Sequence, residues 1–132
     1  MFGSMAQYEH LPIYKLTYDL LIRTMTATKD YPREYKYTLG QKMKDEIIEL
    51  VVLIYKANSA ADKEQHIAMI LERVQVVQLL MRLSHDMKIL TRKHYAAIAE
   101  MTDSLARQAQ GWQKSSGKRK PERDQVAVNN GA

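Results

Sequence analysis

Basic and aromatic side chains alternate in one short stretch of the chain, and this combination suits nucleic-acid binding. Tyr31, Tyr35 and Tyr37 lie among basic residues that begin at Arg33. Cations neutralise phosphates, and aromatic rings beside them can stack on unpaired bases. Tyrosine-rich turns also often cover the end of a hydrophobic core, and lysine-rich turns are often only solvated, so spacing alone leaves both interpretations open. The candidate nucleic-acid contacts are Arg33, Lys36, Lys42, Lys44, Arg82, Arg92 and Lys93, with Tyr35 and Tyr37 as stacking partners.

Arg82 has a second interpretation. Its stretch of helix is apolar on nearly every side, and Asp86 lies four residues further along the chain. This spacing places two side chains on one face of a helix, where opposite charges pair. We therefore expect Arg82 either to contact phosphate or to form a buried ion pair with Asp86.

Histidines could bind metal or transfer protons, but they form no recognisable site pattern. Four-helix bundles that hold two iron ions carry a Glu-x-x-His motif on two helices. None of His66, His85 and His94 has an acidic residue three positions before it, so that motif is absent. The sequence also contains no glycine-rich phosphate loop, no Gly-x-Ser-x-Gly elbow and no His-Glu-x-x-His motif. We predict a protein that is not an enzyme and binds no metal and no cofactor.

The carboxylates Asp45, Glu46 and Glu49 form a further group of titratable residues. Lys42 precedes Glu46 by four residues, the spacing at which opposite charges pair along a helix. We expect this group to be a solvated, ion-paired helix face.

Length and composition fit one small domain. The chain has 132 residues, of which 45% are hydrophobic and 27% charged, as in an ordinary globular protein. It has no cysteine, which excludes disulfides, a cysteine-based zinc site and a thiol nucleophile. No apolar run approaches the roughly 18 residues of a membrane span, and the first residues lack the pattern of a secretory signal. We expect a cytoplasmic protein that does not enter the membrane.

The net charge of +5 is unevenly distributed. Residues 114–132 carry five Lys and Arg against two acidic residues, which leaves +2 for the rest of the chain. Binding of a polyanion by the folded part therefore requires that its cations cluster, or that an oligomer repeats them.

Four stretches with apolar residues at helical spacing predict an all-α protein. The first helix begins at Pro12, a favourable first position, and ends before the break at Lys29–Pro32. The second begins after that break and runs to about Ala57. Gly40, near its start, either allows a close helix contact or lies in a frayed turn. The expected core face of the first helix is Ile13, Leu16, Leu20 and Leu21.

The third helix is expected to follow a capping box at Ser59–Asp62 and to run to about Met87, and the fourth to be capped by Thr91. Short connections make successive helices antiparallel, which predicts an up-down-up-down four-helix bundle. In such a bundle the first and third connections lie at the same end, so the two groups of candidate contacts meet there. The expected organisation is a flexible lead (1–11), the bundle (12–113) and a disordered basic tail (114–132).

The second and third helices are apolar over a wider face than one core contact requires. They are either the most buried pair of the bundle or helices that also pack against another copy of the chain. We predict an oligomer formed through this surplus apolar surface.

The segment Tyr31–Gln41, YPREYKYTLGQ, resembles the aromatic-Pro…Tyr-Thr-Leu-Gly-Gln segment of two related groups of four-helix-bundle proteins. One group is the accessory variability determinant (Avd) of diversity-generating retroelements. The other is encoded in intervening sequences of bacterial large-subunit ribosomal RNA genes. Leu80–Leu83 with Asp86, and Gly111 before Trp112, are more similar to the Avd group. The second group has an Asn-Ile-Ala-Glu-Gly segment where this chain has IYKAN, which also favours Avd.

The resemblance covers roughly residues 12–113 and implies a function. Proteins of the Avd group form a homopentameric barrel with a basic surface, which binds a reverse transcriptase and RNA or DNA and supports mutagenic cDNA synthesis from a template RNA. Five copies of this chain would carry about +25, a field that can hold a polyanion. The alternative is a structural adaptor of the intervening-sequence type, which binds a protein partner without nucleic acid. Salt-dependent binding to RNA or DNA separates the two.

Overall fold

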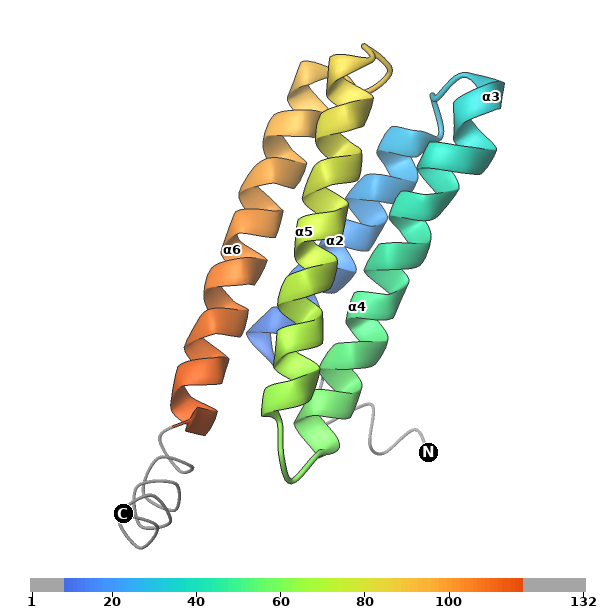
Figure 1. Cartoon of the computed structure of the whole chain (residues 1–132). Helices are drawn as coiled ribbons and strands as arrows, with labels where there is room; N and C mark the ends of the chain where they lie inside the picture. Colours follow the sequence, from blue (N-terminus) through green and yellow to red (C-terminus); the bar gives the residue numbers. More distant parts are fainter. Residues whose placement is uncertain (1–8, 118–132) are drawn as a thin grey trace, which may run out of the picture.

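The computed structural model describes residues 9–117, which form four long helices (Figure 1). A short turn of helix and a π-helical segment lead directly into the second long helix. Contacts run from each long helix to the next and from the last back to the first, which confirms the antiparallel up-down-up-down bundle. No helix among the described residues is both long and apolar enough to cross a bilayer. The elements are α2 (Pro12–Thr28), α3 (Arg33–Tyr35), η1 (Lys36–Gly40), α4 (Gln41–Ser59), α5 (Glu64–Asp86) and α6 (Arg92–Gly117).

The core is built from aliphatic side chains on the inner face of each helix. Leu20, Ile47, Ile67 and Leu105 are fully buried, one from each long helix. On α2 the inner face differs from the expected one, because Leu16 and Leu21 are only half-buried. Their places are taken by the buried threonines Thr17, Thr24 and Thr28.

Buried threonines are compatible with the core because the helix backbone can accept their hydroxyl protons. The Thr17 hydroxyl donates to the carbonyl oxygen of Ile13 at 2.7 Å, and that of Thr28 donates to the carbonyl of Thr24 at 2.8 Å. A hydroxyl satisfied within its own turn avoids the cost of an unpaired polar group. Thr24 is the exception, because its buried hydroxyl has no hydrogen-bond partner among the described residues.

The connection between α4 and α5 is not the expected capping box. Ser59 is the last residue of α4, its hydroxyl donates to the Tyr55 carbonyl, and α5 begins only at Glu64. The connection is held instead by Lys63, whose ammonium group donates to three carbonyl oxygens around the end of α4 at 2.9–3.1 Å. A cation suits the negative end of a helix dipole, and it satisfies carbonyls that have no partner within the helix.

The connection between α5 and α6 is closed by a residue with positive φ. Lys88 has φ 63°, and the next two amides, of Ile89 and Leu90, donate to the Ser84 carbonyl at 3.0 and 3.2 Å. The hydroxyl of Thr91 then accepts from the amide of His94 at 3.2 Å, which confirms Thr91 as the cap of α6. The chain therefore reverses direction within residues 87–91.

Gly40 packs against the first connection at the end of η1. A Cβ atom at this position would lie 3.4 Å from Thr28, from the Tyr31 ring and from the Tyr35 carbonyl oxygen. Gly40 is buried, which contradicts the interpretation as a frayed turn, but these distances are ordinary van der Waals contacts and do not require glycine. Tyr31 beneath it is 3% exposed, and burial raises the pKa of its phenol, an effect that the Ser84 hydroxyl partly offsets.

The ends of the described part lie close to the expected limits of the bundle. Residues 9–11 precede α2, and α6 ends at Gly117, four residues beyond the expected end of the bundle at residue 113. The rest of the expected lead, residues 1–8, and of the expected tail, residues 118–132, lies outside the described residues.

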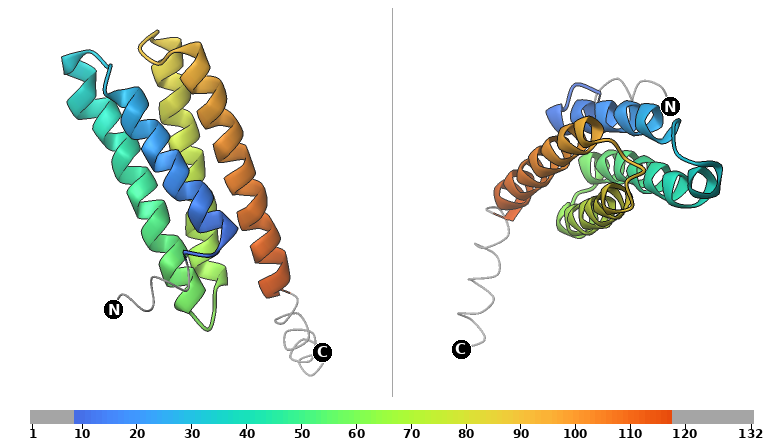
Figure 2. Two further views of the ribbon diagram at one scale, coloured as in Figure 1. Left: turned by 180° about the vertical axis from the view of Figure 1, so that it is seen from behind. Right: turned by 90° about the horizontal axis from the view of Figure 1, so that it is seen from above.

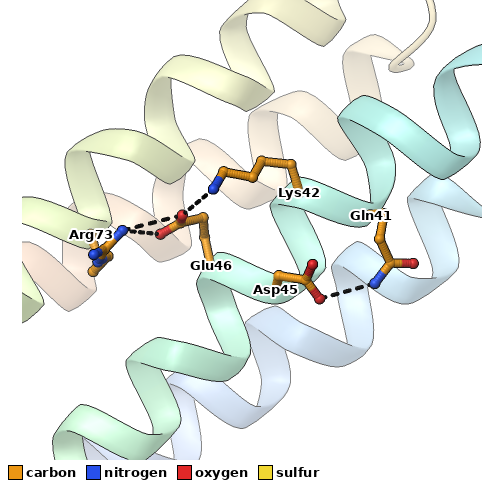
Figure 3. A network of polar contacts seen from close by, with 5 residues as sticks. All are labelled: Gln41, Lys42, Asp45, Glu46 and Arg73. Atoms are coloured by element: carbon orange, nitrogen blue, oxygen red, sulfur yellow. Dashed lines mark hydrogen bonds and ion pairs between the residues drawn. The ribbon is translucent and has the colours of Figure 1, made fainter.

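Glu46 is buried, contrary to the expectation of a solvated acidic face. Lys42 lies 3.1 Å from its carboxylate as expected, but Arg73 of α5 approaches the same carboxylate at 3.1 Å from the other side (Figure 3). Asp45, by contrast, is exposed and accepts a hydrogen bond from Gln41. The i,i+4 spacing could not reveal a partner on a different helix, and that partner is what makes burial of Glu46 possible.

Replacing Arg73 by alanine leaves Glu46 buried with Lys42 alone. We expect Arg73→Ala to lower the free energy of unfolding by about 2 kcal/mol, because an underpaired buried carboxylate is costly. The matched control is Lys42→Ala, which removes the solvent-exposed partner of the same carboxylate and should cost less than about 1 kcal/mol. Urea unfolding followed by circular dichroism measures both, and equal losses would contradict this account.

Candidate nucleic-acid interface

The bundle brings the two groups of basic candidates to one end. The first connection comprises residues 29–32 and continues into α3 and η1, and the third comprises residues 87–91. Both lie at the upper end in Figure 1. The views in Figure 2 show the same arrangement from behind and from above. We call residues 23–45 and 82–93 the basic end.

Charge is strongly segregated along the bundle. The basic end holds ten Lys and Arg against four Asp and Glu, a net charge of +6. The rest of the described chain, residues 9–22, 46–81 and 94–117, holds six against nine, a net charge of −3. The folded part therefore has a modest total charge but a concentrated positive region, which is what polyanion binding requires.

Most cations of the basic end are not neutralised by carboxylates. Of the Lys and Arg at this end, only Lys42 and Arg82 form ion pairs within residues 9–117, with Glu46 and Asp86 as their partners. His85 also lies 3.8 Å from the Asp86 carboxylate. The other eight Lys and Arg make no ion pair within the described part, so their charge is available to phosphate. Among the predicted contacts, Arg33, Lys42, Arg92 and Lys93 are exposed, and Lys36 and Lys44 are half-buried.

Arg82 does pair with Asp86, but the pair is not buried. The Nε–Oδ2 distance is 3.9 Å, and the two side chains are 75% and 65% exposed. The apolar residues around Arg82 do not cover it, because Leu79 and Leu83 are themselves exposed on the outer face of α5. The buried-pair expectation is therefore wrong, and a loose surface pair leaves Arg82 accessible.

The tyrosines of this end divide between core and surface. Tyr31 is buried, and Tyr35 is half-buried and packs against the core, so these two cover the end of the bundle. Tyr37 is 70% exposed. Of the two predicted stacking residues, only Tyr37 presents a free ring.

Three further cations belong to the basic end and were not among the predicted contacts: Arg23, Lys29 and Lys88. Lys88 is exposed and lies in the connection between α5 and α6. Lys29 lies in the first connection and Arg23 one and a half turns earlier on α2. Lys29 could have been found from its position in the same turn as Tyr31. Arg23 carries no local signal, because no other basic residue lies within five positions of it in the sequence.

The histidines and the pocket of the described part show no arrangement typical of a metal site. No group of three or more potential metal-binding side chains occurs among residues 9–117. His85 stacks on Tyr95, with ring centroids 4.2 Å apart and planes at 20°, and so links α5 to α6. A cavity of about 290 Å³ at the opposite end is lined by Leu11, Pro12, Ile13, Gln108 and Trp112, none of which titrates.

The sequence profile of the bAvd-like family matches residues 11–116 of the chain. The chain belongs to the bAvd-like family. This match spans all four helices of the Avd-like bundle and confirms the resemblance inferred from its motifs. No curated protein matches the chain significantly.

The Avd-like bundle exposes apolar stripes on three of its four long helices. In each stripe the side chains recur at intervals of three and four residues and so share a helix face. The stripe on α2 was not expected from the sequence, whereas those on α4 and α5 were. No large hydrophobic side chain of α6 is among the exposed ones in the described part. The members are Tyr18, Ile22 and Met25 on α2, Ile48, Val52 and Tyr55 on α4, and Leu79 and Leu83 on α5.

Removing two unpaired cations from the basic end tests its role. We expect Arg33→Ala with Lys36→Ala to weaken RNA and DNA binding roughly tenfold at low salt and to flatten the slope of log K against log salt. The control is Lys56→Ala with Arg107→Ala, which removes the same charge from exposed helix positions away from the basic end. Fluorescence anisotropy titrations at several salt concentrations measure both. Equal losses in the two double variants would show that only total charge matters.

Proposed function

We propose that the chain is a non-enzymatic accessory protein of a diversity-generating retroelement. In this proposal it binds nucleic acid through its basic end and associates with a reverse transcriptase and template RNA in the cytoplasm, where it supports mutagenic cDNA synthesis. The observation that carries the proposal is the group of eight unpaired cations at one end of a bundle of the Avd-like family. Unpaired, solvent-facing cations from two connections suit contacts to phosphates, which are weakly sequence-selective.

The same proposal includes assembly of five copies into a homopentameric ring. A ring requires a heterologous contact, in which two different patches of one copy meet those of its neighbours. The bundle offers such patches, because α2 and α5 lie diagonally across it and each carries an exposed apolar stripe. The polar outer face of α6 would then remain in water. Copies in the same orientation would bring their basic ends together at one rim.

Assembly is tested by the mass of the particle in solution. We expect light scattering to give about five times the 15.3 kDa mass of one chain, and Leu79→Glu to reduce that mass while leaving helicity intact. The reason is that Leu79 is 65% exposed in the single copy, so a charge there harms only a contact between copies. Gln110→Glu, which adds the same charge on the exposed face of α6, is the control. A 15.3 kDa particle at micromolar concentration would contradict the ring.

The accessory role is tested by reconstitution. We expect the gene for this chain to lie beside a reverse-transcriptase gene and a variable repeat, and the two proteins to co-purify after co-expression. Nuclease treatment before elution separates direct protein contact from bridging by RNA. Template-primed cDNA synthesis should fall strongly when the chain is omitted. A protein complex that survives nuclease, together with no salt-dependent binding of RNA or DNA by the chain, would favour the adaptor function instead.

A further inference from the structure

Tyr37 has an exposed ring in surroundings unlike those of the apolar stripes. At 70% exposure it is the most exposed large hydrophobic side chain of the described residues. Residues one turn away on either side, Arg33, Glu34 and Gln41, and the adjacent Thr38, are all exposed and polar or charged. A ring surrounded in this way adds little to an apolar contact between proteins, which requires a contiguous patch.

The ring is carried by a well-fixed segment of backbone. The turn α3 is closed by hydrogen bonds from the amides of Tyr35 and Lys36 to the Pro32 carbonyl, both 2.9 Å long. The Thr38 hydroxyl donates to the Glu34 carbonyl at 2.9 Å, and buried Gly40 packs on Tyr31 at the end of the segment. Because η1 is π-helical, it inserts an extra residue before α4 begins, and such insertions are frequent at functional sites. Tyr37 is thus held outward by its anchored neighbours.

Cations lie beside the ring and are free to bind phosphate. Arg33 is one turn before Tyr37 and exposed, and Lys36 is the preceding residue. Neither makes an ion pair within residues 9–117. Glu34 is the acidic residue of this segment, so the segment 33–37 is net positive. An exposed ring next to unpaired cations is the combination that proteins use for single-stranded nucleic acid.

We propose that Tyr37 stacks on an unpaired base of a single strand, RNA or DNA, whose phosphates are bound by Arg33 and Lys36. The inference rests on the proposed function and adds to it a preference for unpaired over paired nucleic acid. Phosphate contacts alone give no such preference, because both forms present phosphates. Stacking does, because in a duplex the faces of the bases are already covered by their neighbours.

The experiment compares nucleic acids whose bases are unpaired, paired or absent. The probes are labelled oligouridine, oligothymidine, an abasic strand of the same length and a matched duplex, each measured by anisotropy at one salt concentration. We expect Tyr37→Leu to weaken binding of the oligouridine or the oligothymidine strand about fivefold or more, and Tyr37→Phe, which keeps the ring, to change it by less than about twofold. Comparison of the two strands shows whether RNA or DNA is the source of the base. Binding of the duplex and of the abasic strand should be the same for Tyr37→Leu and the parent.

The outcomes separate this inference from the proposed function. If the parent binds all four probes and Tyr37→Leu weakens none of them, or weakens all equally, the stacking role is overturned and the proposed function stands. If the parent binds no probe even at low salt, the proposed function fails, and the stacking role with it. Melting curves of the three proteins should coincide, because Tyr37 is exposed; a lowered melting temperature for Tyr37→Leu would assign the ring to the fold.

Discussion

The arrangement of the molecule depends on the brevity of its connections. Residues 29–32, 60–63 and 87–91 are too few to carry the chain from one end of a helix to the other, so each helix must run back along its predecessor. This places the first and third connections together and the second at the opposite end. The basic residues at the first and third turns are separated by about half of the chain, and topology alone makes them neighbours.

Two cations outside the basic end stabilise the fold. Away from the basic end, Lys63 binds the last carbonyls of α4, and Arg73 binds the carboxylate of Glu46. Both ammonium and guanidinium groups already contact oxygen atoms of the protein, so they stabilise the fold and are less accessible to a ligand. At the basic end most cations have no ion-pair partner in the described part, and the net charge of +6 distinguishes this end from the rest of residues 9–117.

The sequence predicted most of the fold because periodic apolar residues indicate the buried face of each helix, and helix breaks indicate where each helix ends. Leu20, Ile47 and Leu105 are such positions, and so is the cap at Thr91. It failed where a residue's environment is supplied by another helix. Glu46 was expected to be solvated, since its partner Arg73 is 27 positions away. Thr17 and Thr28 of α2 were not predicted in the core for a different reason: their residue type is polar, and the sequence does not show that the hydroxyl is hydrogen-bonded within its own turn. For the candidate interface, spacing identified the cations but could not distinguish Tyr37 from Tyr35, because exposure depends on how α3 and η1 pack on the core.

Within residues 9–117, the separation of +6 at one end from −3 over the rest makes the bundle an electric dipole aligned with its long axis. The field of a nearby polyanion attracts the protein and also rotates it, so the basic end faces the polyanion before any contact forms. Encounters in the wrong orientation are repelled, which shortens the search for a productive complex. This orienting effect weakens once the Debye length falls below the size of the bundle, so salt should slow association before it abolishes binding.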